Sequence, residues 1–477
     1  MVVRSFIVHH CSFVLPFGPS IRPSMALLPN RSLPNSDTDI LSKPQPPQPP
    51  FTPAIPTDSH SQRPHHHTTT LPHHHSSTMA ASNAVTVKVH FVDGEYENLQ
   101  VTEDITAGQL RDLFAIKIGM RPADEAEMGP EFRGPECFSI WVCGDDVELE
   151  LSDEDRPFEF MSGWKNLMRQ YSNVLDEPWY RAKQAKRKKG KIKEPPCKIF
   201  FRTTALLAKP YERKFPSPGN PWHPAVVDTL WKQAHQWMLN AYYPEAKADD
   251  AVELAALYMQ IKFGDYNPKL HKVNFVPMKK LIAPRLAKKK KDKEWFKLVQ
   301  PKHAELAGKD KLICQLLYLQ RVRQFKTHNA TMFEAVYNYD RESMFEHPFE
   351  SGVVLGVNAD GLFMVDLLKM KYLYFYHWSQ VKDWEFTQES FSCVLTESEP
   401  GEDGTYEDKT HVFFTYQGEL LVELIEAALD DLDAEAERVE RTAKAQQKER
   451  EKQKWDTIKR GNRRSQLEAA ADDIPEL

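Results

Sequence analysis

The spacing of apolar and polar residues predicts a mixed α/β lobe over residues 84–203. Two stretches in which apolar and polar residues alternate are typical of strands, and Asp93-Gly94 between them favours a hairpin turn. Over 107–118 the apolar spacing changes to three and four residues, which predicts a helix that ends at Gly119. Strands are predicted at 85–91, 96–101, 138–142, 149–151 and 198–202.

The next segment, 204–329, has the pattern of a helical bundle. Apolar residues recur three and four apart over 224–241 and over 249–263, and the second of these predicted helices ends at Gly264. The same spacing continues over 302–325, which predicts one further long helix. Several helices within about 120 residues indicate a compact bundle.

Short strands return over 330–433 and predict a small barrel or sandwich. Turn signals such as Asp360-Gly361 separate these strands at near-regular intervals. An amphipathic helix is predicted from Gln417 to about Leu432, and alternating charges over 434–477 predict a solvated helical extension. The strands are predicted at 333–337, 353–357, 362–365, 372–378, 384–386, 392–395 and 412–416.

The N-terminal segment, 1–82, differs in composition and is not expected to form a core. Residues 1–78 hold 14 of the 34 prolines and 9 of the 18 histidines, and PQPPQPP at 44–50 favours an extended chain. Three interpretations stay open: a disordered tail, a targeting peptide interrupted by prolines, and a stretch that precedes the true translation start at Met79.

Composition places the remainder of the chain among ordinary globular proteins. The 477 residues are 41% hydrophobic and 27% charged, with a formal net charge of −6, so a basic binding site has to be local. Six scattered cysteines without a CxxC pair fit a reducing compartment and argue against a disulfide scaffold or a zinc site. No apolar run reaches the roughly 18 residues that a membrane-spanning helix needs.

Motifs for catalysis are absent from the sequence, which contains no Gly-rich phosphate loop, nucleophile elbow or HExxH. Asp265 and His271 lie six residues apart across Asn267-Pro268, and we expect them to cap and end helices rather than to transfer protons. The sequence therefore favours a non-catalytic binding protein with no cofactor and no metal.

Short motifs in each predicted lobe resemble those of the FERM module of ezrin-type and talin-type proteins. They are LSDEDRPFEFM at 151–161 and KIFFR at 198–202 in the first lobe, QIKFGDYNPKLHK at 260–272 in the second, and VKDWEF at 381–386 with FSCVL at 391–395 in the third. The resemblance covers about residues 84–433, and the second and third lobes are most similar to talin. It implies a multidomain α+β fold: a ubiquitin-like lobe, an acyl-CoA-binding-protein-like helical lobe, and a PH/PTB-like barrel capped by a C-terminal helix.

Two basic clusters are candidate lipid sites. Residues 181–193, predicted to form a loop, hold eight basic residues and no acid, and 279–297 hold nine basic residues against two acids. Each cation near an acidic leaflet contributes about 1 kcal/mol. Trp295 and Phe296 are candidates either for the headgroup boundary or for the bundle core. The candidate lipid-binding residues are Lys186, Arg187, Lys188, Lys189, Lys288, Lys289, Lys290 and Lys291, and the resemblance implies phosphoinositides as the ligand.

Trp384, Phe386 and Phe391 are the candidate partner-binding residues. Resemblance to talin-type lobes places them beside a groove between a strand and the C-terminal helix, where an extended peptide can add a strand. Alternation puts Trp384 and Phe386 on one face, and core packing is the alternative for all three.

The resemblance implies a cytoplasmic adaptor that is peripheral at the plasma membrane or cell cortex. Its expected partners are phosphoinositides, the cytoplasmic tail of a membrane protein and cytoskeletal proteins. The alternative is an intracellular scaffold whose basic loops bind RNA or an acidic protein. Nucleic acid is the less expected ligand, because the interleaved aromatics and Gly-rich backbone typical of single-strand readers are missing from the sequence.

Overall fold

The computed structural model of the chain describes residues 84–121, 135–144, 147–191, 195–207, 211, 215–219, 222–273, 275–338, 352–396 and 407–472. The N-terminal segment 1–82, with its three open interpretations, lies outside these residues, and so does Lys193 of the first basic cluster.

The first lobe is built on a mixed five-stranded sheet in the order β2-β1-β5-β3-β4. β1 and β5 run parallel, and the other neighbouring pairs are antiparallel. This arrangement confirms the ubiquitin-like lobe. The strands are β1 (Ala84–His90), β2 (Tyr96–Thr102), β3 (Phe138–Gly144), β4 (Glu148–Glu150) and β5 (Cys197–Thr203).

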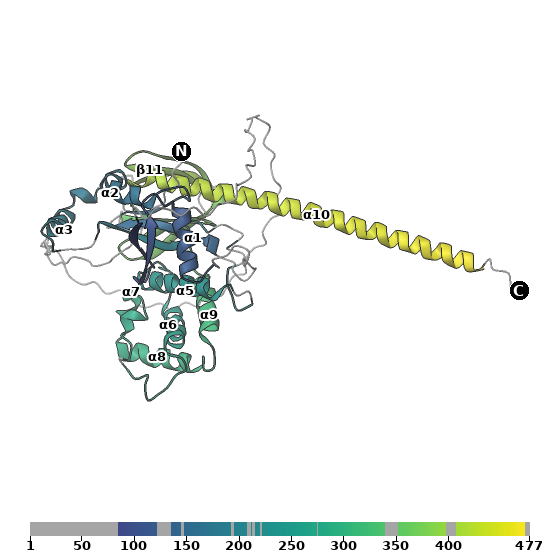
Figure 1. Ribbon diagram of the computed structural model, residues 1–477, viewed down its shortest axis with the longest axis horizontal. Helices are drawn as coiled ribbons and strands as arrows, with labels where there is room; N and C mark the ends of the chain where they lie inside the picture. Colours follow the sequence, from purple (N-terminus) through teal and green to yellow (C-terminus); the bar gives the residue numbers. More distant parts are fainter. Residues whose placement is uncertain are drawn as a thin grey trace, which may run out of the picture. The chain divides into compact units, whose positions relative to one another are not determined.

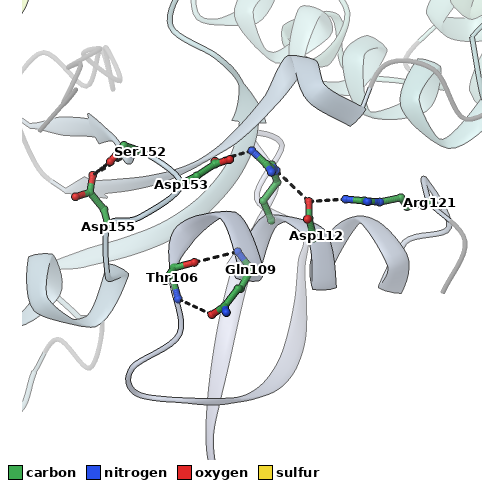
Figure 2. Close-up of polar contacts among 8 residues, drawn as sticks. Thr106, Gln109, Asp112, Arg121, Ser152, Asp153 and Asp155 are labelled. Atoms are coloured by element: carbon green, nitrogen blue, oxygen red, sulfur yellow. Dashed lines mark hydrogen bonds and ion pairs between the residues drawn. The ribbon is translucent and has the colours of Figure 1, made fainter. Parts of the chain in front are cut away.

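Helix α1 (Ala107–Lys117) is fixed at its start by reciprocal hydrogen bonds (Figure 2). The Thr106 hydroxyl accepts from the Gln109 amide at 3.3 Å, and Gln109 Oε1 accepts from the Thr106 amide at 3.1 Å. This capping box satisfies amides that the helix leaves without a partner. The Gly108 amide donates to the Asp153 carbonyl at 3.0 Å, an approach that a Cβ at position 108 would crowd, because it would lie 3.0 Å from the Asp153 Cβ.

Two helices occupy the segment between β4 and β5, namely α2 (Pro157–Tyr171) and α3 (Pro178–Lys188). The prediction of a basic loop from residue 181 onward is therefore wrong up to Lys188. A proline in the first helical turn begins each helix with a preset φ angle. Lysine and arginine are good helix formers, and their charge complements the negative C-terminal end of α3.

The second lobe is helical, as predicted, but one predicted helix is divided. The break falls at 305–310, because Gly308 adopts a φ of 78° and the Asp310 side chain accepts from the Ile313 amide at 2.8 Å to begin a new helix. Figure 1 shows α6, α8 and α9 together, and α6 packs against both of the others. The helices are α5 (Pro224–Leu239), α6 (Ala248–Phe263), α7 (Pro284–Ala287), α8 (Asp292–Ala304) and α9 (Lys311–Val322).

The third lobe is an antiparallel seven-stranded sheet in the order β10-β11-β12-β6-β7-β8-β9, followed by helix α10 (Gly418–Asp472). The first turns of α10 bury leucines against the sheet, whereas every residue from 436 to 450 is exposed. The predicted succession of short strands and a C-terminal helix is confirmed as a seven-stranded antiparallel sheet followed by a long helix (Figure 1). Among the described residues, β9 and β10 do not pair, so the sheet is open at these two strands. The strands are β6 (Thr331–Tyr337), β7 (Gly352–Asn358), β8 (Gly361–Asp366), β9 (Lys371–His377), β10 (Val381–Phe386), β11 (Ser390–Thr396) and β12 (Asp408–Phe414).

Buried hydrogen bonds connect the lobes to one another. The Gln233 side chain on α5 accepts from the Thr203 amide at 3.1 Å and donates to the Thr203 hydroxyl at 2.5 Å. The Thr331 hydroxyl at the start of β6 donates to the Ala205 carbonyl at 2.6 Å. Because both contacts are buried, the end of β5 is held by the second lobe and the residues just after it by the third lobe.

Candidate interaction surfaces

Strand β10 lies at one end of the seven-stranded sheet, so one of its edges has no neighbouring strand among the described residues. Trp384 and Phe386 pair with Cys393 and Phe391 of β11 and therefore face the same side of the sheet as these buried residues. Trp384 is half-buried, whereas Phe386 keeps 45% of its surface exposed. Helix α10 contacts β10, and the sheet edge beside the start of α10 is therefore apolar and partly open.

Phe391, in contrast to Trp384 and Phe386, is not accessible at the surface. Its side chain has no exposed surface, and its ring stacks on Phe413 of β12 with centroids 6.1 Å apart. Phe391 lies on a strand that is paired on both sides and covered by α10, so it belongs to the core and supports Phe386 from within.

The first basic cluster lies at the end of helix α3. Lys186, Lys188 and Lys189 are exposed, and Arg187 is half-buried. The Arg187 guanidinium donates to the Pro195 carbonyl at 3.5 Å, which ties the end of α3 to the chain that leads into β5. Three of the four predicted cations are therefore directed to solvent.

The second basic cluster follows helix α7. Lys288, Lys289, Lys290 and Lys291 are all exposed, between the end of α7 and the start of α8. Trp295, in contrast, is fully buried, and its indole Nε1 donates to the Ala287 carbonyl at 3.2 Å. The core interpretation of Trp295 is therefore correct, and this residue positions the lysine run instead of reaching a headgroup.

An apolar surface that the sequence analysis missed lies between α6 and α7. Phe263, Leu270, Val273 and Phe275 are exposed, Leu270 by 63%, and the rings of Phe263 and Phe275 meet edge to face at 4.9 Å. The only sequence feature that could have indicated this surface is the placement of apolar residues among lysines. The same pattern is typical of an ordinary loop, so the surface is recognised only from the exposure of its side chains. The lysines of this segment are Lys262, Lys269 and Lys272.

Polar side chains, of which His271 and His303 are buried, hold this segment in place. The Asp265 carboxylate accepts from the Gln260 side chain at 2.7 Å and the Gly308 amide at 2.8 Å, and these hydrogen bonds lower its pKa. His271 and His303 stack with centroids 5.3 Å apart, and burial lowers the pKa of both. Both imidazoles are therefore neutral at pH 7, and the positive charge of the segment comes from its lysines.

The described cysteines offer no reactive thiolate. All five are buried. Burial raises the pKa of Cys137 and Cys143 far above the ordinary value and that of Cys393 to about 12. Nowhere in the described ranges do three or more His, Cys, Asp or Glu side chains gather as a metal site would require, and none of the described helices is long and apolar enough to cross a bilayer.

Comparison with known proteins agrees with this architecture. The family model of the FERM central domain matches residues 217–333, which is the helical lobe between the two sheets. The C-terminal MyTH4-FERM domain of human myosin 7b, solved with the harmonin-a PDZ3 domain, superposes with a TM-score of 0.51 at 14% identity, over 73% of this chain and 60% of that one. The chain has the FERM fold.

Relatives in sequence are FERM and talin proteins of Dictyostelium discoideum. FERM domain-containing protein B is 22% identical over 435 residues, which are 72% of this chain and 86% of the relative. Talin-A is 24% identical over 178 residues, which are 37% of this chain and only 7% of the talin. FERM domains are typically non-catalytic adaptor modules, and their proteins are typically cortical or peripheral at membranes.

Proposed function

We propose that this FERM-domain protein is an adaptor that binds the cytoplasmic tail of a membrane protein at β10 and phosphoinositide lipid at its helical lobe. The observation that carries the proposal is the position of Phe386. It faces inward at an open sheet edge, beside the start of α10, yet remains 45% exposed. Unpaired strand amides and carbonyls next to an exposed apolar side chain are what an added peptide strand requires.

Lipid binding is supported by two features of the helical lobe. The four exposed lysines Lys288–Lys291 supply charge, and at about 1 kcal/mol each they suffice for peripheral attachment to an acidic leaflet. The exposed apolar side chains of 263–275 supply surface that can enter the headgroup region between lysines. Similarity to talins favours lipid and cytoskeletal partners over RNA or an acidic protein.

The experiment measures the affinity of two ligands for the unmodified chain and for two variants, each with one phenylalanine replaced. The full chain is titrated with fluorescein-labelled cytoplasmic-tail peptides and, separately, with vesicles that contain phosphatidylinositol 4,5-bisphosphate. We expect Phe386→Ala to lose peptide affinity and to keep vesicle affinity. Phe263→Ala is the matched control, because Phe263 is 42% exposed on the other surface, and it should show the reverse.

Peptide binding that survives Phe386→Ala would refute the tail site. A salt series with single-stranded RNA tests the alternative scaffold function. If the chain binds RNA tightly at physiological salt and does not bind the vesicles, the lipid assignment is wrong.

A further inference from the structure

An acidic cleft of about 770 Å³ separates the first lobe from helix α10. Its walls are the turn after β4 on one side and the third and fourth turns of α10 on the other. Among its described lining residues, Arg111 is the only base. Six acids line the cleft: Glu136, Glu150, Asp153, Glu154, Asp430 and Asp431.

Arg111 offsets only part of this excess, because it is one cation against six acids and its charge is shared between Asp153 of the cleft and Asp112 outside it. Its guanidinium lies 2.6 Å from Asp153 Oδ1 and 3.1 Å from Asp112 Oδ1, and Arg121 also reaches Asp112 at 2.8 Å (Figure 2). Burial acts to lower the Arg111 pKa, but the two carboxylates outweigh it and the pKa is raised. Arg111 therefore stays a cation that pairs within the first lobe, and the cleft keeps a net negative charge.

The floor of the cleft holds a polar atom without a partner. Ser139 on β3 lines the cleft and is only 7% exposed, and its hydroxyl makes no hydrogen bond. A buried hydroxyl of this kind costs free energy until a group that enters the cleft pairs with it. This observation is independent of the acids and also indicates that the cleft accommodates a polar ligand.

The acids are spread along the cleft and do not converge. No three of the described carboxylates are grouped as a cation site would require, so a single metal ion does not match the arrangement. Glu136 and Glu154 of the first lobe and Asp430 of α10 are exposed to solvent, on both walls. Several separate positive charges on one extended chain match carboxylates that are spaced in this way.

One wall is rigid before any ligand binds. The Asp155 carboxylate accepts from the amide and the hydroxyl of Ser152 at 2.8 and 2.7 Å (Figure 2). The carbonyls of Asp155 and Asp153 accept from the first amides of α1, Ala107 and Gly108. A turn fixed on both sides holds Asp153 and Glu154 in place, which reduces the entropy lost when a ligand binds.

We propose that this cleft docks an extended lysine- and arginine-rich segment of a partner protein. The segment lies between the turn 152–155 and α10, its cations pair with carboxylates of both walls, and one donor reaches the Ser139 hydroxyl. This site is separate from β10 and from the lysine clusters. Because the cleft is acidic, it selects a basic partner, whereas the lysine clusters select an acidic one.

The test uses the full chain and a fluorescein-labelled nine-residue peptide in which arginine and serine alternate. We expect saturable binding that weakens as salt increases, and no binding of the peptide with glutamate in place of arginine. The double variant Glu154→Gln, Asp430→Asn removes one exposed charge from each wall and should weaken binding about tenfold. The control Glu437→Gln, Glu440→Gln makes the same charge change on α10 beyond the cleft and should leave the affinity within about twofold.

The variant Ser139→Ala distinguishes binding inside the cleft from nonspecific electrostatic attraction, because it changes no charge. We expect it to weaken the peptide about threefold, in line with the loss of one neutral hydrogen bond. Equal effects of the two double variants, or an unchanged affinity in Ser139→Ala, would overturn the proposal. A dimer in analytical ultracentrifugation that the cleft variant abolishes, without peptide binding, would assign the cleft to a second copy and also overturn it.

Discussion

Phe386 and Phe391 are direct cross-strand partners of the same residue type, and truncating each to alanine should give very different losses of stability. Phe391 is fully buried between β12 and α10, so Phe391→Ala leaves a cavity and should cost about 3–5 kcal/mol. Phe386 has little more than half of its surface covered. Since full burial of a phenylalanine contributes about 1.5–3 kcal/mol, Phe386→Ala should cost about 1 kcal/mol.

The measurement has to report on the third lobe, because a chain of several lobes does not unfold in one step. Amide hydrogen exchange of β11 and β12 follows the local opening free energy of this sheet. We expect exchange there to accelerate by more than a hundredfold in Phe391→Ala and by less than about tenfold in Phe386→Ala. Similar acceleration in both variants would refute the distinction between a core and a groove phenylalanine, and with it the tail site at β10.

Three further predictions concern the lipid face, the sheet of the third lobe and a buried histidine. Replacing Lys288–Lys291 by alanine should remove up to about 4 kcal/mol of binding free energy to acidic vesicles, with little change in melting temperature. A control variant that replaces four other exposed lysines, Lys382, Lys409, Lys444 and Lys448, should bind the vesicles normally. Equal losses in the two variants would assign the effect to net charge. Gly356→Ala should destabilise the third lobe by about 1–3 kcal/mol in a urea melt, because its Cβ would lie 2.0 Å from the buried ring of Phe363, and an unchanged midpoint would contradict this packing. Burial lowers the pKa of His235 to about 4, so the folded chain resists protonation; its stabilising contribution is present above pH 6.5 and is lost, by about 3 kcal/mol, as the pH falls from 6.5 to 4. His235→Gln should reduce the slope of stability against pH in this window, and an unaltered slope would show that other groups produce it.

Local spacing in the sequence was enough for most elements of the fold. The hairpin of β1 and β2, the helices α1, α5 and α6 and the strands of the third lobe all lie close to their predicted positions. Apolar residues spaced two apart in a strand, or three and four apart in a helix, share a face, and this property depends only on backbone geometry. The misses have local causes as well. Pro178 begins α3, and the lysines and arginines that suggested a loop are good helix formers. Gly308 with Asp310 divided a continuous apolar pattern.

Only the tertiary structure decided which apolar and charged side chains remain accessible. Alternation placed Trp384 and Phe386 on one face, but the sheet order and the start of α10 determine that Phe386 is partly open and Phe391 closed. Trp295 lies among lysines in the sequence and yet is buried under α7. The acids of the cleft come from segments almost 300 residues apart, and their excess of charge exists only where two lobes meet. The physical reason is that a residue's exposure depends on what packs over its face, and the covering element is distant in the chain.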